Sequence, residues 1–95
     1  MAKSIIQTEK ECYITGSTYN LNLHHIVYGN GLRKLSDKYG LTIWIRADWH
    51  NMSDYCVHFN KKIDTELKQM AQKKAMEVYK WSVEDFIKIF GQNYL

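Results

Sequence analysis

The sequence predicts a single α+β domain spanning residues 1–95. In its first half, short runs rich in β-branched and aromatic residues alternate with glycine-containing turns, a pattern typical of strands. From residue 60 onward, apolar residues recur at helical spacing, which predicts helices that pack on those strands. The chain has 45% hydrophobic and 24% charged residues and no proline, so a folded globular domain is favoured over a disordered one.

Strands are expected in three places. Residues 11–15 and 21–27 are rich in Tyr, Ile, Leu and Val, and the polar residues 16–20 between them indicate a turn. The strongest strand signal is residues 41–46, where β-branched side chains surround Trp44. We therefore predict a hairpin of the first two segments and a third strand.

Helices are expected at residues 32–39, 60–80 and 82–90. Gly40 and Gly91 follow the first and third segments as C-terminal stops. Asn60 is a suitable N-cap for the second helix, and Ser82 with Asp85 resembles a capping box for the third. The second and third helices present apolar stripes, and Met70, Met76, Phe86 and Phe90 are predicted to be core residues.

The sequence also predicts where the protein is located and what its cysteines can form. Its apolar runs are far shorter than the roughly 20 residues of a bilayer-spanning helix, and no signal-peptide pattern opens the chain. A cytoplasmic location with no membrane partner is expected, and residues 1–10 are predicted to form a flexible N-terminus. Cys12 and Cys56 are far apart, which excludes a disulfide scaffold and a four-cysteine zinc site.

The formal net charge of +3 is unevenly distributed. Residues 29–46 carry Arg33, Lys34, Lys38 and Arg46 against one acidic residue, and residues 61–80 carry six Lys against three acidic residues. Such stretches usually form solvated faces, and they also suit contacts with phosphate groups.

All four histidines lie between residues 24 and 58: His24, His25, His50 and His58. Taken singly, each histidine is more often structural than catalytic. The doublet is different, because successive side chains of a strand point to opposite faces. One imidazole can therefore face a metal ion while its neighbour faces a substrate.

Imidazoles suit phosphodiester cleavage in two ways. A divalent ion held by two or three of them keeps open positions for a phosphate oxygen. A separate imidazole, with its pKa near neutrality, can take a proton from the attacking water. Asp48, Asn51 and Asp54 are further candidate oxygen ligands, although a helix-capping role is favoured for Asp54.

Five motifs and their order resemble the small HNH endonucleases of the His-Me finger group, and in particular short phage and prophage proteins of that group. The resemblance covers residues 11–95. The motifs are Cys12-Tyr13-Ile14-Thr15-Gly16, Leu23-His24-His25-Ile26, the segment from Gly29 through Arg33-Lys34-Leu35 to Leu41, Trp49-His50-Asn51, and Val57-His58-Phe59-Asn60.

The resemblance implies a ββα-metal fold, a hairpin-plus-helix core with additional C-terminal helices. It implies that His24 binds the catalytic metal, that His25 acts as general base and that His50 completes the metal site. The role of His58 is left open between an extra metal ligand, a residue that supports a ligand and a phosphate contact. One divalent ion is expected, and Mg²⁺, Mn²⁺, Ni²⁺ and Zn²⁺ all remain candidates.

The sequence departs from the family pattern at the structural zinc. Relatives commonly hold this ion with two Cys-x-x-Cys pairs, and here the four positions are Cys12, Thr15, Arg46 and Trp49. Only Cys12 is retained, so no structural zinc is expected and apolar packing should hold the hairpin. This departure makes a catalytically degenerate member of the family an alternative.

The leading hypothesis is a phage-related, metal-dependent endonuclease that hydrolyses DNA with low sequence specificity. The expected DNA phosphate contacts are Arg33, Lys34, Lys61 and Lys62. One alternative is a non-catalytic phage factor that acts on a host protein or DNA, and another is an unrelated α+β domain with structural histidines. A homodimer and a phage or host protein partner stay open, with Trp49, Trp81 and Tyr94 as exposed aromatic candidates for an interface.

Overall fold

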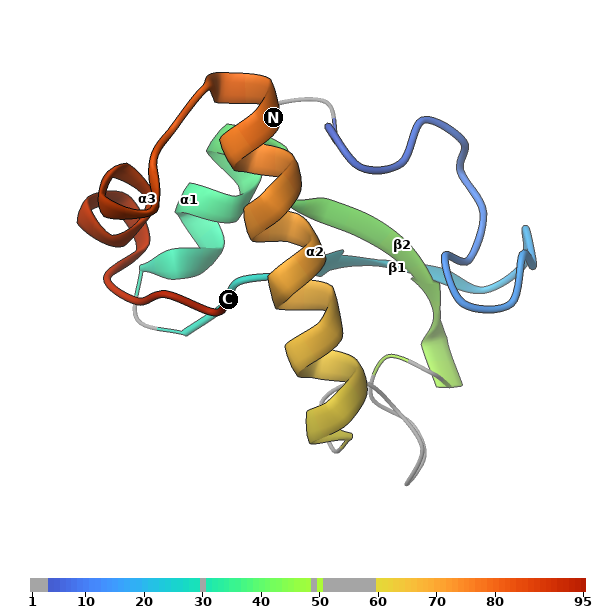
Figure 1. The fold of residues 1–95 in the computed structure, drawn as a ribbon. Helices are drawn as coiled ribbons and strands as arrows, with labels where there is room; N and C mark the ends of the chain where they lie inside the picture. Colours follow the sequence, from blue (N-terminus) through green and yellow to red (C-terminus); the bar gives the residue numbers. More distant parts are fainter. Residues whose placement is uncertain (1–3, 30, 49, 51–59) are drawn as a thin grey trace.

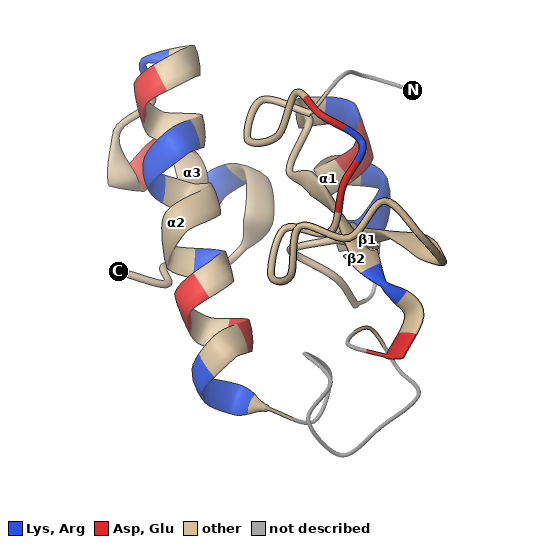
Figure 2. Cartoon of the chain, turned by 90° about the vertical axis from the view of Figure 1, so that its right-hand side faces the viewer, with Lys and Arg blue, Asp and Glu red and all other residues tan. Residues whose placement is uncertain are grey.

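The structure, a computed structural model, describes residues 4–29, 31–48, 50 and 60–95. Its elements are, in chain order, β1 (Leu21–His25), α1 (Leu32–Tyr39), β2 (Thr42–Arg46), α2 (Lys61–Tyr79) and α3 (Val83–Phe90). The two strands form one antiparallel sheet. Figures 1 and 2 show α2 lying against the layer formed by α1 and the sheet. The predicted α+β class is confirmed.

The pairing of the two strands fixes the position of the histidine doublet. His24 lies opposite Ile43, and His25 lies opposite Thr42. Ile43 and Ile45 are completely buried, as expected for alternate residues of a strand with one face on the core. The predicted strand over residues 41–46 is therefore confirmed, and it holds the end of β1 against the core.

Residues 11–15 do not form a strand, so the predicted hairpin of this segment with residues 21–27 is wrong. The chain turns here instead: the Gly16 amide donates to the Cys12 carbonyl (2.8 Å), and the Cys12 amide donates to the Ser17 carbonyl (2.6 Å). Gly16 has a φ of 78°, which a residue without Cβ adopts at little cost. β1 pairs with β2 instead, and the Tyr13 amide donates to the Trp44 carbonyl of β2 (2.8 Å).

β1 also ends earlier than predicted, at His25, because Val27 bonds to a side chain and not to a strand. The buried Ser36 hydroxyl donates to the Val27 carbonyl (2.6 Å) and accepts from the Val27 amide (3.1 Å). Ser36 belongs to α1, which occupies the predicted helix at residues 32–39 and is capped by Gly40. One hydroxyl thus fastens α1 to the turn that follows the histidine doublet.

Ser36→Ala is expected to lower the free energy of unfolding by about 1–3 kcal/mol, because it leaves two backbone groups of Val27 buried without a partner. Urea denaturation measures this loss. Ser17→Ala is the matched control, since the hydrogen bonds of Ser17 with Tyr19 lie at the surface. Its loss should stay within about 0.5 kcal/mol. Equal losses in the two variants would contradict this role of Ser36.

The two C-terminal helices form where predicted. The Asn60 side chain accepts from the Ile63 amide (3.2 Å) and caps α2. The Ser82 hydroxyl accepts from the Asp85 amide (3.1 Å), and the Asp85 carboxylate accepts from the Ser82 amide (3.0 Å), which completes a capping box at α3. Each cap satisfies amides that the first helical turn leaves without intrahelical partners.

The C-terminal segment is fastened to α2 by buried Gln72. Its side chain accepts from the Tyr94 amide (2.8 Å) and donates to Asn93 Oδ1 (2.8 Å). Tyr94 and Trp81 are partly buried and pack against the core, so the expectation that they are exposed is wrong, and their role in an interface stays a prediction. Their rings join an aromatic cluster that fills the space between the helices. The third interface candidate, Trp49, lies outside the described residues.

Part of the predicted flexible N-terminus over residues 1–10 contacts β2 and the residues before it. The Ile5 amide donates to the Gly40 carbonyl (2.9 Å), and the Trp44 amide donates to Gln7 Oε1 (2.7 Å). These bonds use backbone groups that β1 leaves unpaired. Among the described residues, no helix has the length and apolar character needed to cross a bilayer.

Candidate metal centre

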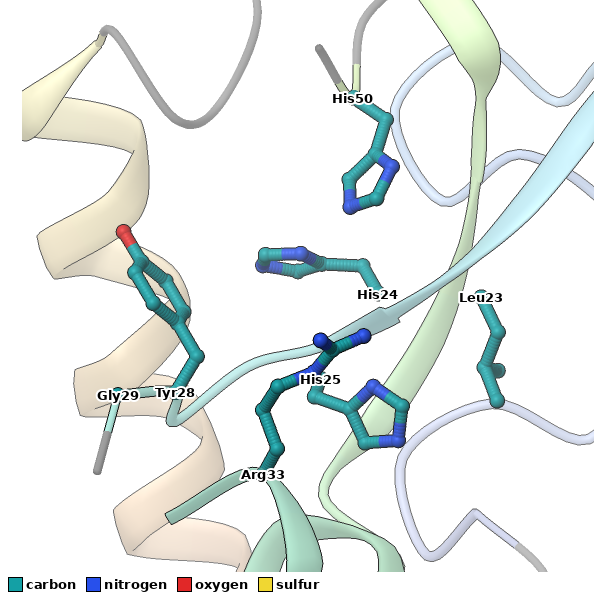
Figure 3. A pocket seen from close by; sticks show the side chains of 7 residues that line it. All are labelled: Leu23, His24, His25, Tyr28, Gly29, Arg33 and His50. Atoms are coloured by element: carbon teal, nitrogen blue, oxygen red, sulfur yellow. The ribbon is translucent and has the colours of Figure 1, made fainter. Parts of the chain in front are cut away.

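The two histidines of the doublet point to different sides of the strand end. Figure 3 shows His24 directed toward α2 and His25 directed toward the other side. His24 is almost completely buried, with 1% of its surface exposed, whereas His25 is only partly buried. The alternation of strand side chains therefore directs the two imidazoles to opposite sides of the strand end, as predicted, with His24 buried and His25 partly buried.

His50 joins His24 in space although 26 positions separate them in the chain. Their ring centroids are 5.2 Å apart, and their planes are inclined by 74°. Two imidazoles that bind one ion through nitrogen atoms at about 2.0–2.1 Å have centroids roughly 4.5–5.2 Å apart. The observed separation therefore fits two ligands of a single ion, and the residues present suit the divalent metal that the sequence predicts.

His50 is also hydrogen-bonded to β1. Its Nδ1 lies 3.3 Å from Oδ1 of Asn22. Asn22 precedes His24 by two residues and so projects from the same face of the strand. This face of β1 thus carries His24, one candidate metal ligand, and Asn22, which is hydrogen-bonded to His50, the other candidate ligand.

His25 has a different environment. Its Nε2 lies 3.5 Å from Oδ1 of Asp37 in α1. Its Nδ1 is buried and has no hydrogen-bond partner among the described residues. A carboxylate beside one ring nitrogen favours a proton there and leaves the lone pair on the other nitrogen. This leaves Nδ1 as the nitrogen of His25 that can accept a proton once water and substrate occupy the pocket that His25 lines.

A pocket of about 280 Å³ connects the two environments. Figure 3 shows its lining, which includes all three described histidines and the side chain of Arg33 from the first turn of α1. The lining residues are Leu23, His24, His25, Tyr28, Gly29, Arg33 and His50. A guanidinium group beside imidazoles can bind the oxygens of a phosphate group in bidentate fashion.

The other predicted phosphate contacts are exposed and lie outside the pocket lining. Lys34 is on α1, and Lys61 and Lys62 form the first turn of α2. Figure 2 shows basic residues on both helices, with acidic residues interspersed along α2. Of the four residues predicted to contact phosphate, the structure thus places only Arg33 with the histidines.

Sequence reasoning missed Tyr28, which forms a wall of the pocket. Its ring centroid lies 6.0 Å from that of His24, and its hydroxyl donates to Asp64 Oδ1 of α2 (3.0 Å). Lys68 pairs with the same carboxylate (2.8 Å) and lies over the Tyr28 ring. Burial, reinforced by Asp64, raises the pKa of Tyr28 to about 12, so the hydroxyl keeps its proton and ties the pocket to α2.

The additional oxygen ligands suggested by the sequence are not brought to the histidines. Asp48 forms a bidentate pair with Arg46, at 2.6 and 2.8 Å. Asn51, Asp54 and His58 lie outside the described residues. Within the described ranges, no group of three or more His, Cys, Asp or Glu side chains is placed to hold a metal ion. The described part of the centre is therefore the His24–His50 pair.

The sequence matches no protein-family model, no curated protein and no solved structure. The observed fold class is α+β with a two-stranded antiparallel sheet and three helices.

Proposed function

We propose that the protein is a metal-dependent endonuclease that hydrolyses DNA phosphodiester bonds, with a ββα-metal core formed by β1, β2 and α2. The observation that carries this proposal is the grouping of His24, His50, His25 and Arg33 around one pocket. Two imidazoles at the separation of shared ligands, a third imidazole outside the pair and a guanidinium group together meet the needs of metal-assisted phosphodiester hydrolysis.

The proposed roles follow from the position of each side chain. His24 and His50 would hold the divalent ion, and the bound ion would supply positive charge that offsets the negative charge on the scissile phosphate. His25 takes the proton of the attacking water through Nδ1, while Asp37 lies at the opposite ring nitrogen. The water oxygen then bonds to phosphorus as the bond from phosphorus to the leaving 3′ oxygen breaks. A bound ion would stabilise the negative charge left on that oxygen until solvent protonates it. Arg33 binds the phosphate oxygens and orients the group.

Low sequence specificity is part of the proposal. Lys34, Lys61 and Lys62 are exposed lysines on the two helices that flank the sheet. Contacts of lysine and arginine with phosphates contribute affinity and position without reading bases. We therefore assign these three residues and Arg33 to the DNA backbone, and we expect DNA affinity to fall steeply as the salt concentration rises.

The proposal is tested by nicking of supercoiled plasmid with the pure protein in EDTA and then in Mg²⁺, Mn²⁺, Ni²⁺ or Zn²⁺. We expect cleavage with at least one ion and none in EDTA. His24→Ala, purified in parallel and shown to be folded by circular dichroism, should not cut, which excludes a contaminating nuclease. Branched and single-stranded substrates extend the test.

A folded protein that leaves every substrate intact with every ion would overturn the nuclease proposal. If that protein still bound DNA or captured a protein, the result would support the alternative of a catalytically degenerate binding protein. Thr15, Arg46 and Trp49 at the positions of the usual zinc thiolates are the sequence feature that favours this alternative. Size-exclusion chromatography with light scattering would report whether the active species is a homodimer.

A further inference from the structure

Asn22 and His50 make a hydrogen bond that links the candidate metal centre to the strand beside it. Asn22 lies in β1 opposite Ile45 of β2, and its Oδ1 is 3.3 Å from His50 Nδ1. The two residues are 28 positions apart in the chain. Because Asn22 and His50 lie in different segments of the chain, this contact forms only when the chain is folded.

The chemistry of the contact determines where the proton of His50 lies. The carbonyl oxygen of an asparagine side chain only accepts hydrogen bonds. With Asn22 Oδ1 as the acceptor, Nδ1 of His50 carries the proton, and in the neutral ring Nε2 then carries the lone pair. A metal ion binds an imidazole through such a lone pair.

We propose that Asn22 is a positioning residue that holds His50 in the Nδ1–H tautomer and turns its Nε2 toward the ion shared with His24. This inference rests on the proposed function, because it assumes that His50 is a metal ligand. Hydrogen bonds to the outer nitrogen of a ligating histidine fix its tautomer and its ring orientation, and their loss typically weakens metal binding about 10–100-fold.

The surrounding backbone supports this role of Asn22. The Ala47 amide donates to the Asn20 carbonyl (2.7 Å), which joins the start of β1 to the segment after β2. The Arg46–Asp48 pair adds a second link within that segment. These bonds keep the segment after β2 close to the start of β1, where Asn22 lies. The Asn22 contact then orients the His50 ring.

The first test needs no metal. We would record the side-chain nitrogen spectrum of the protein labelled with ¹⁵N-histidine, at a pH where His50 is neutral. We expect His50 of the wild type to be protonated at Nδ1 and that of Asn22→Asp, which keeps an accepting oxygen, to be the same. Asn22→Leu has a similar volume but no acceptor, and its His50 should populate the Nε2–H tautomer. An Nε2–H tautomer in the wild type would overturn the inference.

Calorimetric titration with Zn²⁺ separates this inference from the proposed function. We expect binding to weaken about 10–100-fold in Asn22→Leu and to be retained in Asn22→Asp. If His50→Ala weakens binding but Asn22→Leu does not, His50 remains a ligand and the positioning role fails. If the wild type binds no Zn²⁺, Ni²⁺ or Mn²⁺, the metal centre itself fails, and the nitrogen spectrum still decides whether Asn22 sets the tautomer.

Discussion

His25→Ala is expected to slow metal-dependent DNA cleavage by about 10²–10⁴-fold, the usual contribution of a positioned general base. His25 points away from the His24–His50 pair and is partly exposed, and its Nδ1 makes no hydrogen bond within the described chain. Removing the ring therefore removes the proton acceptor and leaves the candidate metal ligands in place. Single-turnover cleavage of a labelled duplex, with the ion at saturation, measures the loss in rate.

Two comparisons identify the cause of that loss. The affinity of His25→Ala for the ion should equal that of the wild type, because the variant keeps His24 and His50. Lys34→Ala, on the exposed side of α1, should weaken DNA binding and raise KM with little change in kcat. A cleavage rate within about threefold of the wild type in His25→Ala would rule out His25 as the general base.

Phe86→Ala is expected to lower the free energy of unfolding by about 3–5 kcal/mol, the typical loss for a buried phenylalanine. Phe86 is completely buried in α3. Its ring stacks on Phe90 with centroids 4.7 Å apart and meets the edge of Tyr94 at 6.1 Å. Truncation removes these contacts and leaves a cavity, because the helices around the site can relax only partly. Urea denaturation followed by circular dichroism measures the change.

Ile87→Ala is the matched control for this prediction. Ile87 follows Phe86 in the same helix, and 39% of its surface is exposed. Alanine is also a good helix former, so this substitution should cost well under half as much as Phe86→Ala. Equal losses of unfolding free energy in the two variants would show that burial of Phe86 is not what attaches α3 to the core.

The helices and the second strand were predictable because their signals are local. Asn60 and Ser82 with Asp85 are caps that can be recognised within a few residues, and the apolar spacing of α2 and α3 covers several turns. The strand predicted at residues 11–15 failed for the opposite reason. Its aromatic and β-branched composition suits a strand, but hydrogen bonds between Cys12, Gly16 and Ser17 close a turn there.

The candidate site likewise contains residues that the sequence identified and residues that it did not. The opposite directions of the two doublet side chains could be predicted from strand alternation, whereas the pairing of His24 with His50 was expected from the resemblance to the HNH endonucleases. Asn22, Asp37 and Tyr28 were not identified as site residues, because each acquires its role from a contact made only in the folded chain. Tyr28, for example, meets Asp64 across 36 positions of sequence. One signal was available: Asn22 precedes His24 by two residues and so shares its face.

The central claim is that His24 and His50 hold one divalent ion, and paramagnetic broadening by Mn²⁺ tests it most directly. Substoichiometric Mn²⁺ would be added to the protein while the ring signals of the assigned histidines and the backbone amides are followed by NMR. We expect the signals of His24 and His50 to disappear first, and we expect His24→Ala to abolish this selectivity. Broadening that begins at the acidic residues of α2, or that spreads evenly over the protein, would contradict the account.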